Sequence, residues 1–222
     1  MQVDESFTEY VAVRWSMLSR LATLLVGDEQ ADDLTRAALV RVYLSWSEIQ
    51  ESASADSAVK RILAREAVRN APAPLDRPVV AEDGDLWTQI GGLLPRQRAM
   101  LVLRHYEGLY DPEIADALGC SPSAVTAESL ALETGIDLVE LRRELMRRSD
   151  ESDVAPPPLD ELVLAGRRAR QLRRRRSWTW AAGVAAAVAL AFGVASVLEG
   201  ASGPADPARA SSKRFLSMLP TG

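Results

Sequence analysis

The feature that most constrains the fold of this chain is a pair of helix-start signals separated by one glycine, between Asp111 and Thr134. Asp111 and Ser121 are each followed directly by a proline. Their side chains accept hydrogen bonds from N-terminal N–H groups, and proline is tolerated in the first helical turn. Gly119 lies between the two signals, where a tight turn requires a positive φ that glycine adopts without penalty. This pattern predicts a helix-turn-helix in which a first helix over about 112–118 supports a recognition helix from Pro122 to about Thr134.

The apolar residues of this stretch fit the same motif. Ala115 supplies the small residue needed where the two helices touch, and Val125 supplies the branched apolar residue inside the second helix. The residues expected to complete the core are Ile114, Leu118 and Leu130. A helical hairpin with no role in DNA binding is the alternative interpretation, since such a motif match is a hypothesis about function.

The rest of the chain before residue 177 has helical rather than strand periodicity. Apolar residues recur at three- and four-residue steps through 6–70, and Gly27 breaks this run into two helices. The proline-containing acidic stretches 71–85 and 149–158 interrupt the pattern and indicate linkers. We therefore expect an all-α fold with two small helical domains, 1–70 and 86–148. The tryptophans expected to anchor their cores are Trp15, Trp46 and Trp87.

A run of 22 residues without a charged side chain, Ser177–Leu198, predicts one transmembrane helix. As a helix it spans roughly 33 Å, and the hydrocarbon core of a bilayer is about 30 Å thick. Seven arginines in 167–176 directly precede it, so the positive-inside rule places 1–176 in the cytoplasm and the tail 199–222 outside. A buried alanine-rich helix of a soluble protein is the alternative interpretation of this run.

The segment 149–176, between the second helical domain and the predicted span, is expected to be a linker that ends in a basic juxtamembrane anchor. Its first part is acidic and rich in proline, and Leu159–Leu164 is expected to form a short helix. The arginines that follow are suited to anionic lipid headgroups. Nucleic acid is the alternative partner for these arginines.

The chain has only one cysteine and one histidine, which excludes several classes of disulfide-bonded and metal-binding proteins. Cys120 alone cannot form an intramolecular disulfide, and with His105 it cannot supply the ligands of a zinc finger. The chain also has no glycine-rich phosphate-binding motif. We expect no enzyme activity, no metal and no cofactor, with Cys120 a small buried residue and His105 a surface or half-buried one.

The stretch LPRQRAMLVLRHYEGLYDPEIADALGCSPSAV resembles region 4 of the extracytoplasmic-function sigma factors, and GDEQADDLTRAALVRVYLSWSEI resembles their region 2. The segment VKRILAREAVRN is similar to the following helix of that family, which helps to open the −10 element. The resemblance covers about residues 5–148. It implies that region 2 binds core RNA polymerase and that the region 4 recognition helix contacts the −35 element of a promoter.

The resemblance also implies roles for single residues. The residues implied in polymerase binding are Asp33, Leu34, Arg36, Val40 and Arg41. The residues implied in DNA binding are Ser121, Ser123, Ala124, Thr126, Ala127 and Glu128.

The predicted recognition helix departs from the family in its charge. No Lys or Arg occurs between Ser121 and Thr134, whereas Glu128 and Glu133 do. Cations that meet phosphates supply much of the affinity for DNA, so residues outside this helix must hold the backbone. The candidates are Arg142, Arg143, Arg147 and Arg148.

Two functions from different classes follow from these observations. The favoured one is a membrane-tethered, sigma-factor-like transcription regulator that binds core RNA polymerase and promoter DNA. The alternative is a membrane-anchored interaction protein that keeps the same fold and binds polymerase or another regulatory protein without promoter recognition. Both predict a single-pass protein of the cell membrane with a cytoplasmic N-terminus, and the cation-free recognition helix is the feature that distinguishes them.

Overall fold

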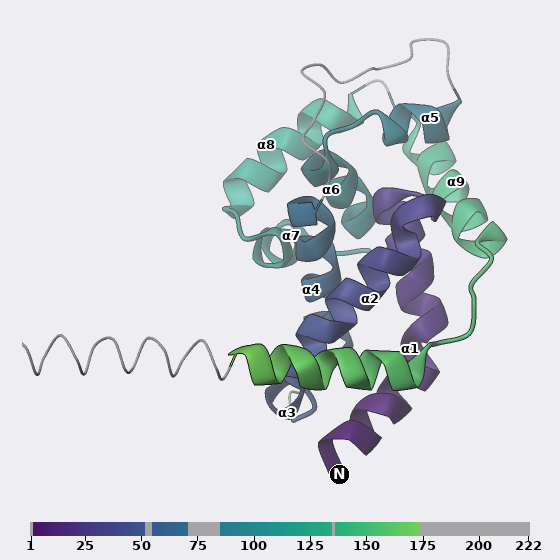
Figure 1. Cartoon of the computed structure of the whole chain (residues 1–222). Coiled ribbons are helices and arrows are strands. Elements are labelled where there is room, and N and C mark those ends of the chain that lie inside the picture. Colours follow the sequence, from purple (N-terminus) through teal and green to yellow (C-terminus); the bar gives the residue numbers. More distant parts are fainter. Residues whose placement is uncertain (1, 52–54, 71–84, 135, 174–222) are drawn as a thin grey trace, which may run out of the picture. The chain divides into compact units, whose positions relative to one another are not determined.

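The computed structural model describes residues 2–51, 55–70, 85–134 and 136–173, and all regular secondary structure in these ranges is helical (Figure 1). The helices are α1 Gln2–Val26, α2 Asp28–Leu44, α3 Trp46–Ile49, α4 Ala55–Asn70, α5 Leu86–Gly91, α6 Pro95–His105, α7 Asp111–Leu118, α8 Pro122–Glu133 and α9 Leu138–Glu151. A further helix, called helix 159–173, covers those residues. The predicted all-α class is confirmed for the described residues.

The chain divides into two compact units, Met1–Gln171 and Leu172–Gly222. Within the described ranges, no helix is both long enough and apolar enough to cross a bilayer. The predicted span 177–198 and the tail 199–222 lie outside the described residues.

Gly27 separates α1 from α2 because it adopts a φ of 88°, a conformation that strains residues with a Cβ. Large aromatic side chains of α1 and of α3, the short helix after α2, are buried. Trp15 is 2% exposed and Trp46 3% exposed, so their predicted core positions are confirmed. The rings of Tyr43 and Trp46 pack edge-on against Phe7 at centroid distances of 5.1 and 5.7 Å. Such ring pairs add about 0.5–1.5 kcal/mol each beyond area burial, and here they join α1 to α2 and α3.

The helices before and after residues 71–84 share one hydrophobic core. Buried residues of α1, α2, α4, α5, α6 and α9 belong to the same cluster. Arg98 of α6 reaches the last turn of α1, where its guanidinium donates hydrogen bonds to the carbonyl oxygens of Leu24 (2.8 Å) and Thr23 (3.4 Å). The predicted linker 71–85 lies almost wholly outside the described residues, and the helices on its two sides belong to one compact unit.

The second predicted linker, 149–158, does not form a free spacer. α9 continues to Glu151, and beyond it the indole N–H of Trp15 donates to the carbonyl oxygen of Ala155 (2.6 Å). The short helix predicted over Leu159–Leu164 extends to residue 173, because only Gly166 interrupts a run of good helix formers. Helix 159–173 is drawn in green in Figure 1.

Candidate nucleic-acid interface

The helix-turn-helix is formed by α7 and α8 at the predicted spacing. α7 ends at Leu118, and its C-cap Gly119 has a φ of 71° and a ψ of 42°. The N–H of Cys120 donates to the carbonyl oxygen of Ala115 (3.0 Å). Ser121 caps α8, and its hydroxyl oxygen accepts from the N–H of Ala124 (3.3 Å). These contacts satisfy backbone groups at both sides of the turn and fix the angle at which α8 leaves it.

The start of α7 differs from the prediction. α7 begins at Asp111, and its cap is Tyr110, whose N–H donates to the carboxylate of Glu113 (2.9 Å). The carboxylate of Asp111 instead accepts hydrogen bonds from the side chains of Arg104 and Thr126. Asp111 therefore connects α7 to α6 and α8 and does not cap its own helix.

The motif's core contains Ile114, Ala115 and Val125, which are all buried, but not Leu130. Leu130 is 71% exposed, so its predicted core position is wrong. It follows Val125 by five residues, which turns it about 140° away around the helix, and Ser129 takes the buried position one turn after Val125.

The predicted DNA-binding residues lie in the cap and the N-terminal half of α8. Ser121, Ser123, Thr126 and Ala127 are exposed, and Ala124 and Glu128 are partly exposed. Ser123, Ala127 and Leu130 follow one another at steps of four and three residues and so form one outward stripe. This stripe carries no charged side chain.

Both glutamates of α8 contact basic side chains of α6. Glu128 lies 3.5 Å from Arg96, and Glu133 contacts Arg104 (3.4 Å) and His105 (3.0 Å). The glutamates therefore do not stand as unpaired charges that would repel phosphates.

Asp111 adds a further negative charge beside α8. The hydrogen bond from Thr126, together with that from Arg104, outweighs partial burial and lowers the pKa of Asp111. The carboxylate is ionised at neutral pH, and the Thr126 hydroxyl is already engaged as its donor. The exposed surface at the start of α8 thus consists of short, mostly polar side chains and has little positive charge.

The arginines predicted to meet phosphates lie on α9 and are engaged within the protein. Arg143, Arg147 and Arg148 each pair with a glutamate of the same helix, and Arg142 donates to the carbonyl oxygen of His105 (3.1 Å). The exposed pairs, Arg143 with Glu140 and Arg147 with Glu151, contribute about 0–1 kcal/mol each, so phosphates can replace these glutamates. Arg148 and its partner Glu144 are partly buried. The paired glutamates still lower the positive potential along α9.

Sequence reasoning missed the contact between α4 and the helix-turn-helix half. Three cations of α4 are involved: Lys60 pairs with Glu107, Arg61 pairs with Asp116 (2.6 Å), and Arg65 donates to the carbonyl oxygens of Asp116 (2.5 Å) and Ala117 (2.9 Å). Arg65 meets carbonyls in the last turn of α7, where the helix dipole favours a cation. The clustering of cations on α4 was visible in the sequence, but their partners lie about fifty residues away and carry no local signal.

The polymerase-binding candidates lie on α2 in different environments. Asp33 and Arg41 are exposed, and Arg36 and Val40 are partly exposed. Leu34 is 6% exposed and belongs to the main core, so it supports α2 from within. Arg41 lies 2.5 Å from the carboxylate of Glu66, and Arg36 pairs with Asp32 of its own helix and with Glu161 of helix 159–173.

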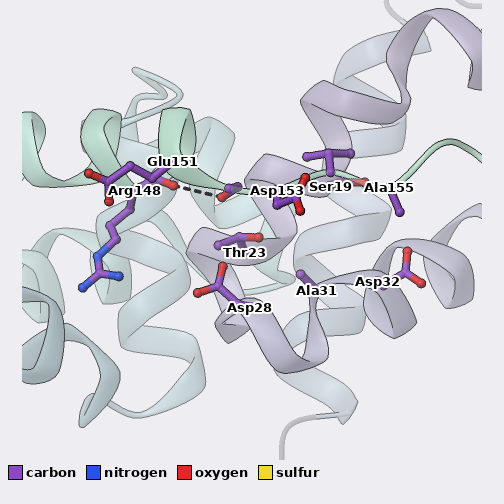
Figure 2. Close-up of a pocket in the computed structure, with 11 residues that line it drawn as sticks. Ser19, Thr23, Asp28, Ala31, Asp32, Arg148, Glu151, Asp153 and Ala155 are labelled. Carbon is purple, nitrogen blue, oxygen red and sulfur yellow. Dashed lines mark hydrogen bonds between the residues drawn. The ribbon is translucent and has the colours of Figure 1, made fainter.

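A cavity of about 400 Å³ lies between α1, the start of α2 and the segment that follows α9 (Figure 2). The carboxylates on its walls are Asp28, Asp32, Glu151 and Asp153. This charge disfavours nucleic acid and other anions at the cavity. Among the described residues, no group of His, Cys, Asp and Glu side chains is arranged to hold a metal ion.

Comparison with known proteins agrees with this geometry. Residues 83–128, which include the helix-turn-helix as far as Glu128, match the family model "Sigma-70, region 4". The chain is 32% identical over 160 residues to the RNA polymerase sigma-E factor of Streptomyces coelicolor, an alignment that covers 64% of this chain and 87% of the relative. It is 33% identical over 136 residues to the RNA polymerase sigma-E factor of Streptomyces avermitilis, which covers 54% of this chain and 76% of that relative. No solved structure gives a significant match.

Proposed function

Because the chain belongs to the RNA polymerase sigma factors of the extracytoplasmic-function type, we propose that it is a membrane-tethered factor that brings core RNA polymerase to a promoter. Sigma factors are initiation factors and not enzymes, and the chain is accordingly a non-enzymatic protein. The observation that carries the proposal is the helix-turn-helix of α7 and α8, which lies within the region 4 match as far as Glu128 and turns the N-terminal half of α8 outward.

Promoter recognition is assigned to the exposed residues at the start of α8. Ser121, Ser123 and Thr126 have short side chains that let the helix approach base edges closely, and serine and threonine hydroxyls hydrogen-bond to several bases. Phosphate contacts are assigned to the α9 arginines, which exchange their partners within the protein for DNA. This division predicts modest DNA affinity for the chain alone and a larger affinity when polymerase supplies further contacts.

Polymerase binding is assigned to the exposed side of α2. Asp33 and Arg41 stand out from the helix, with Arg36 and Val40 beside them, while Leu34 fixes the helix to the core. Exposed charges of both signs on a rigid helix suit a specific protein interface, because they set orientation and exclude unsuitable partners.

The membrane tether is assigned to residues 177–198. Its support is the uncharged run of 22 residues directly behind seven arginines. Protease added to spheroplasts should remove the tail 199–222 and spare residues 1–176. Recovery of the whole chain in the soluble fraction would contradict this assignment.

The alternative function, an interaction protein without promoter recognition, is favoured by one specific observation. The outward stripe of Ser123, Ala127 and Leu130 carries no cation and ends in a leucine that is 71% exposed. Such a surface suits a protein partner better than a phosphate backbone.

One retention experiment separates the two functions. The full chain in mild detergent is mixed with duplexes of random sequence, with and without core RNA polymerase, and retained DNA is sequenced. A promoter-binding factor enriches a common sequence when polymerase is present. Binding to polymerase without any enriched sequence would favour the interaction protein, and failure to bind polymerase would contradict both the sigma-factor proposal and the assignment to α2.

A further inference from the structure

Residues 152–171 form a strap that follows α9 and lies against α1 and α2. At its start, the buried indole of Trp15 donates to the carbonyl oxygen of Ala155 (2.6 Å). Further along, Leu162 is 3% exposed and belongs to the main hydrophobic core. A solvated linker would bury neither group, so the strap is a specific part of the folded unit.

Helix 159–173 is also fitted to Tyr43 of α2. The backbone of Gly166 lies so close to the Tyr43 ring that a Cβ at this position would overlap ring atoms. Arg170 lies over the same ring at 4.7 Å and donates to the carbonyl oxygen of Tyr43 (3.0 Å). The glycine thus permits an approach that no other residue allows, although glycine weakens a helix interior by about 0.5–1 kcal/mol relative to alanine.

Two ion pairs complete the contact. Glu161 lies 2.8 Å from Arg36 of α2, and Arg167 lies 2.6 Å from Asp4 of α1. The Asp4 carboxylate also accepts from the hydroxyl of Tyr43, so Asp4 ties the strap, α1 and α2 together.

The strap covers part of the α2 surface that the proposed function assigns to polymerase. Arg36, Val40 and Tyr43 are four and three residues apart, so they form one stripe of α2. Glu161 contacts the first residue of this stripe, and Gly166 and Arg170 contact the last. A partner that binds Arg36 therefore meets Glu161 of the strap in the same place.

We propose that residues 152–171 act as an intramolecular inhibitor that occupies the Arg36 edge of the polymerase-binding face of α2 and must leave before core polymerase docks there. This proposal rests on the proposed function, since it requires that α2 binds polymerase.

The ion pairs of the strap are of a kind that a partner can displace, whereas Leu162 holds the strap to the core. Glu161 is 76% exposed and Arg167 is 61% exposed, and ion pairs of such exposure are weak. The beginning of the strap also lies beside the cavity of Figure 2, where Asp153 and Ala155 line the wall. The closed form is therefore favoured but reversible.

Gly166→Ala tests the proposal sharply because it improves the helix itself while adding a Cβ that collides with Tyr43. Gly91→Ala is the matched control, since an added Cβ there meets nothing within 4 Å. A second variant, with both Arg167→Ala and Arg170→Ala, removes the contacts of these two arginines without adding atoms that collide, and Arg168→Ala controls for lost charge at an exposed position of the same helix.

Each full-length variant in mild detergent is measured for affinity to core RNA polymerase and for amide hydrogen exchange across residues 159–171. If the strap is closed in about nine molecules of ten or more, its release raises affinity by roughly tenfold or more, because only the open fraction binds. Both release variants should show faster exchange and tighter binding, and both controls should match the wild type. Polymerase should also accelerate exchange of residues 159–171 in the wild type.

Faster exchange without tighter binding would overturn the inhibitory role while leaving polymerase binding intact. Retained protection of residues 159–171 in the wild-type complex would overturn it as well, since strap and polymerase would then bind together. If neither wild type nor variants bind polymerase, the proposed function itself fails, and the inhibitory role falls with it.

Discussion

Replacement of Arg98 tests whether the two helical halves depend on each other for stability. Arg98 is 8% exposed, and its hydrogen bond to the Leu24 carbonyl is 2.8 Å long. Burial lowers the pKa of Arg98 to about 10, so the side chain remains charged at neutral pH. It also lies 4.7 Å from the centre of the Trp87 ring. The guanidinium therefore serves as a C-terminal cap for α1 that is supplied by α6.

The magnitude of the effect follows from these contacts. A hydrogen bond from a charged donor contributes about 1.5–3 kcal/mol, and the 3.4 Å contact to Thr23 adds little. The contact with the Trp87 ring contributes about 0.5–2 kcal/mol. Arg98→Met keeps most of the apolar stem, so we expect a loss of about 2–4 kcal/mol in the free energy of unfolding. For a unit of this size that lowers Tm by roughly 5–15 °C.

The assay is thermal unfolding of the full chain, followed by the circular dichroism of its helices. Arg142→Met is the matched control, because Arg142 also donates to a backbone carbonyl (3.1 Å) but is exposed to water. We expect this control to change the free energy of unfolding by less than about 1 kcal/mol. An unchanged Tm for Arg98→Met, or equal shifts for both variants, would refute the argument that α6 caps α1.

Three further predictions concern the surfaces and their charges. Ala127→Arg adds a cation to the exposed stripe of α8 and should strengthen binding to duplex DNA. A salt titration should then give a slope of log affinity against log salt that is steeper by about 0.9. An unchanged slope would mean that this face of α8 does not contact DNA. Asp33→Arg should weaken co-purification with core polymerase at least tenfold, whereas Glu29→Arg, an exposed control on the same helix, should not. The hydrogen bond from Arg167, together with that from Tyr43, lowers the pKa of Asp4 below 3.8. The ionised Asp4 carboxylate therefore stabilises the folded state fully above pH 3.8, and this stabilisation is lost as the pH falls through the pKa of the folded state. The difference in Tm between wild type and Asp4→Asn should therefore shrink below pH 3.8, and a constant difference would contradict the ion pair.

Local chemistry explains why the helix-turn-helix could be predicted. Gly119 and the cap at Ser121 act through neighbouring backbone groups, and the structure has both in the predicted roles. The prediction that Leu130 is buried was wrong because apolar character alone does not place a residue on the buried face of a helix. The buried position one turn after Val125 is occupied by Ser129.

The strap and the joining of the two halves could not be predicted in this way. The acidic and proline-rich composition of 149–158 indicated a spacer, yet Trp15 donates a hydrogen bond to the backbone carbonyl oxygen of Ala155. Every residue has such a carbonyl, so the sequence does not show which one is bound. Arg98 and Gly166 likewise looked ordinary in sequence. Their importance comes from Leu24 and Tyr43, which fold against them from more than seventy residues away.

A run-off transcription assay tests the central claim most directly. The full chain in mild detergent is combined with core RNA polymerase and a template that carries the sequence enriched by retention. The account predicts a transcript from one start site that requires the chain, and that increases when Gly166→Ala releases the strap. Tight binding of polymerase by both proteins without any specific transcript would contradict the assignment as a promoter-directing sigma factor.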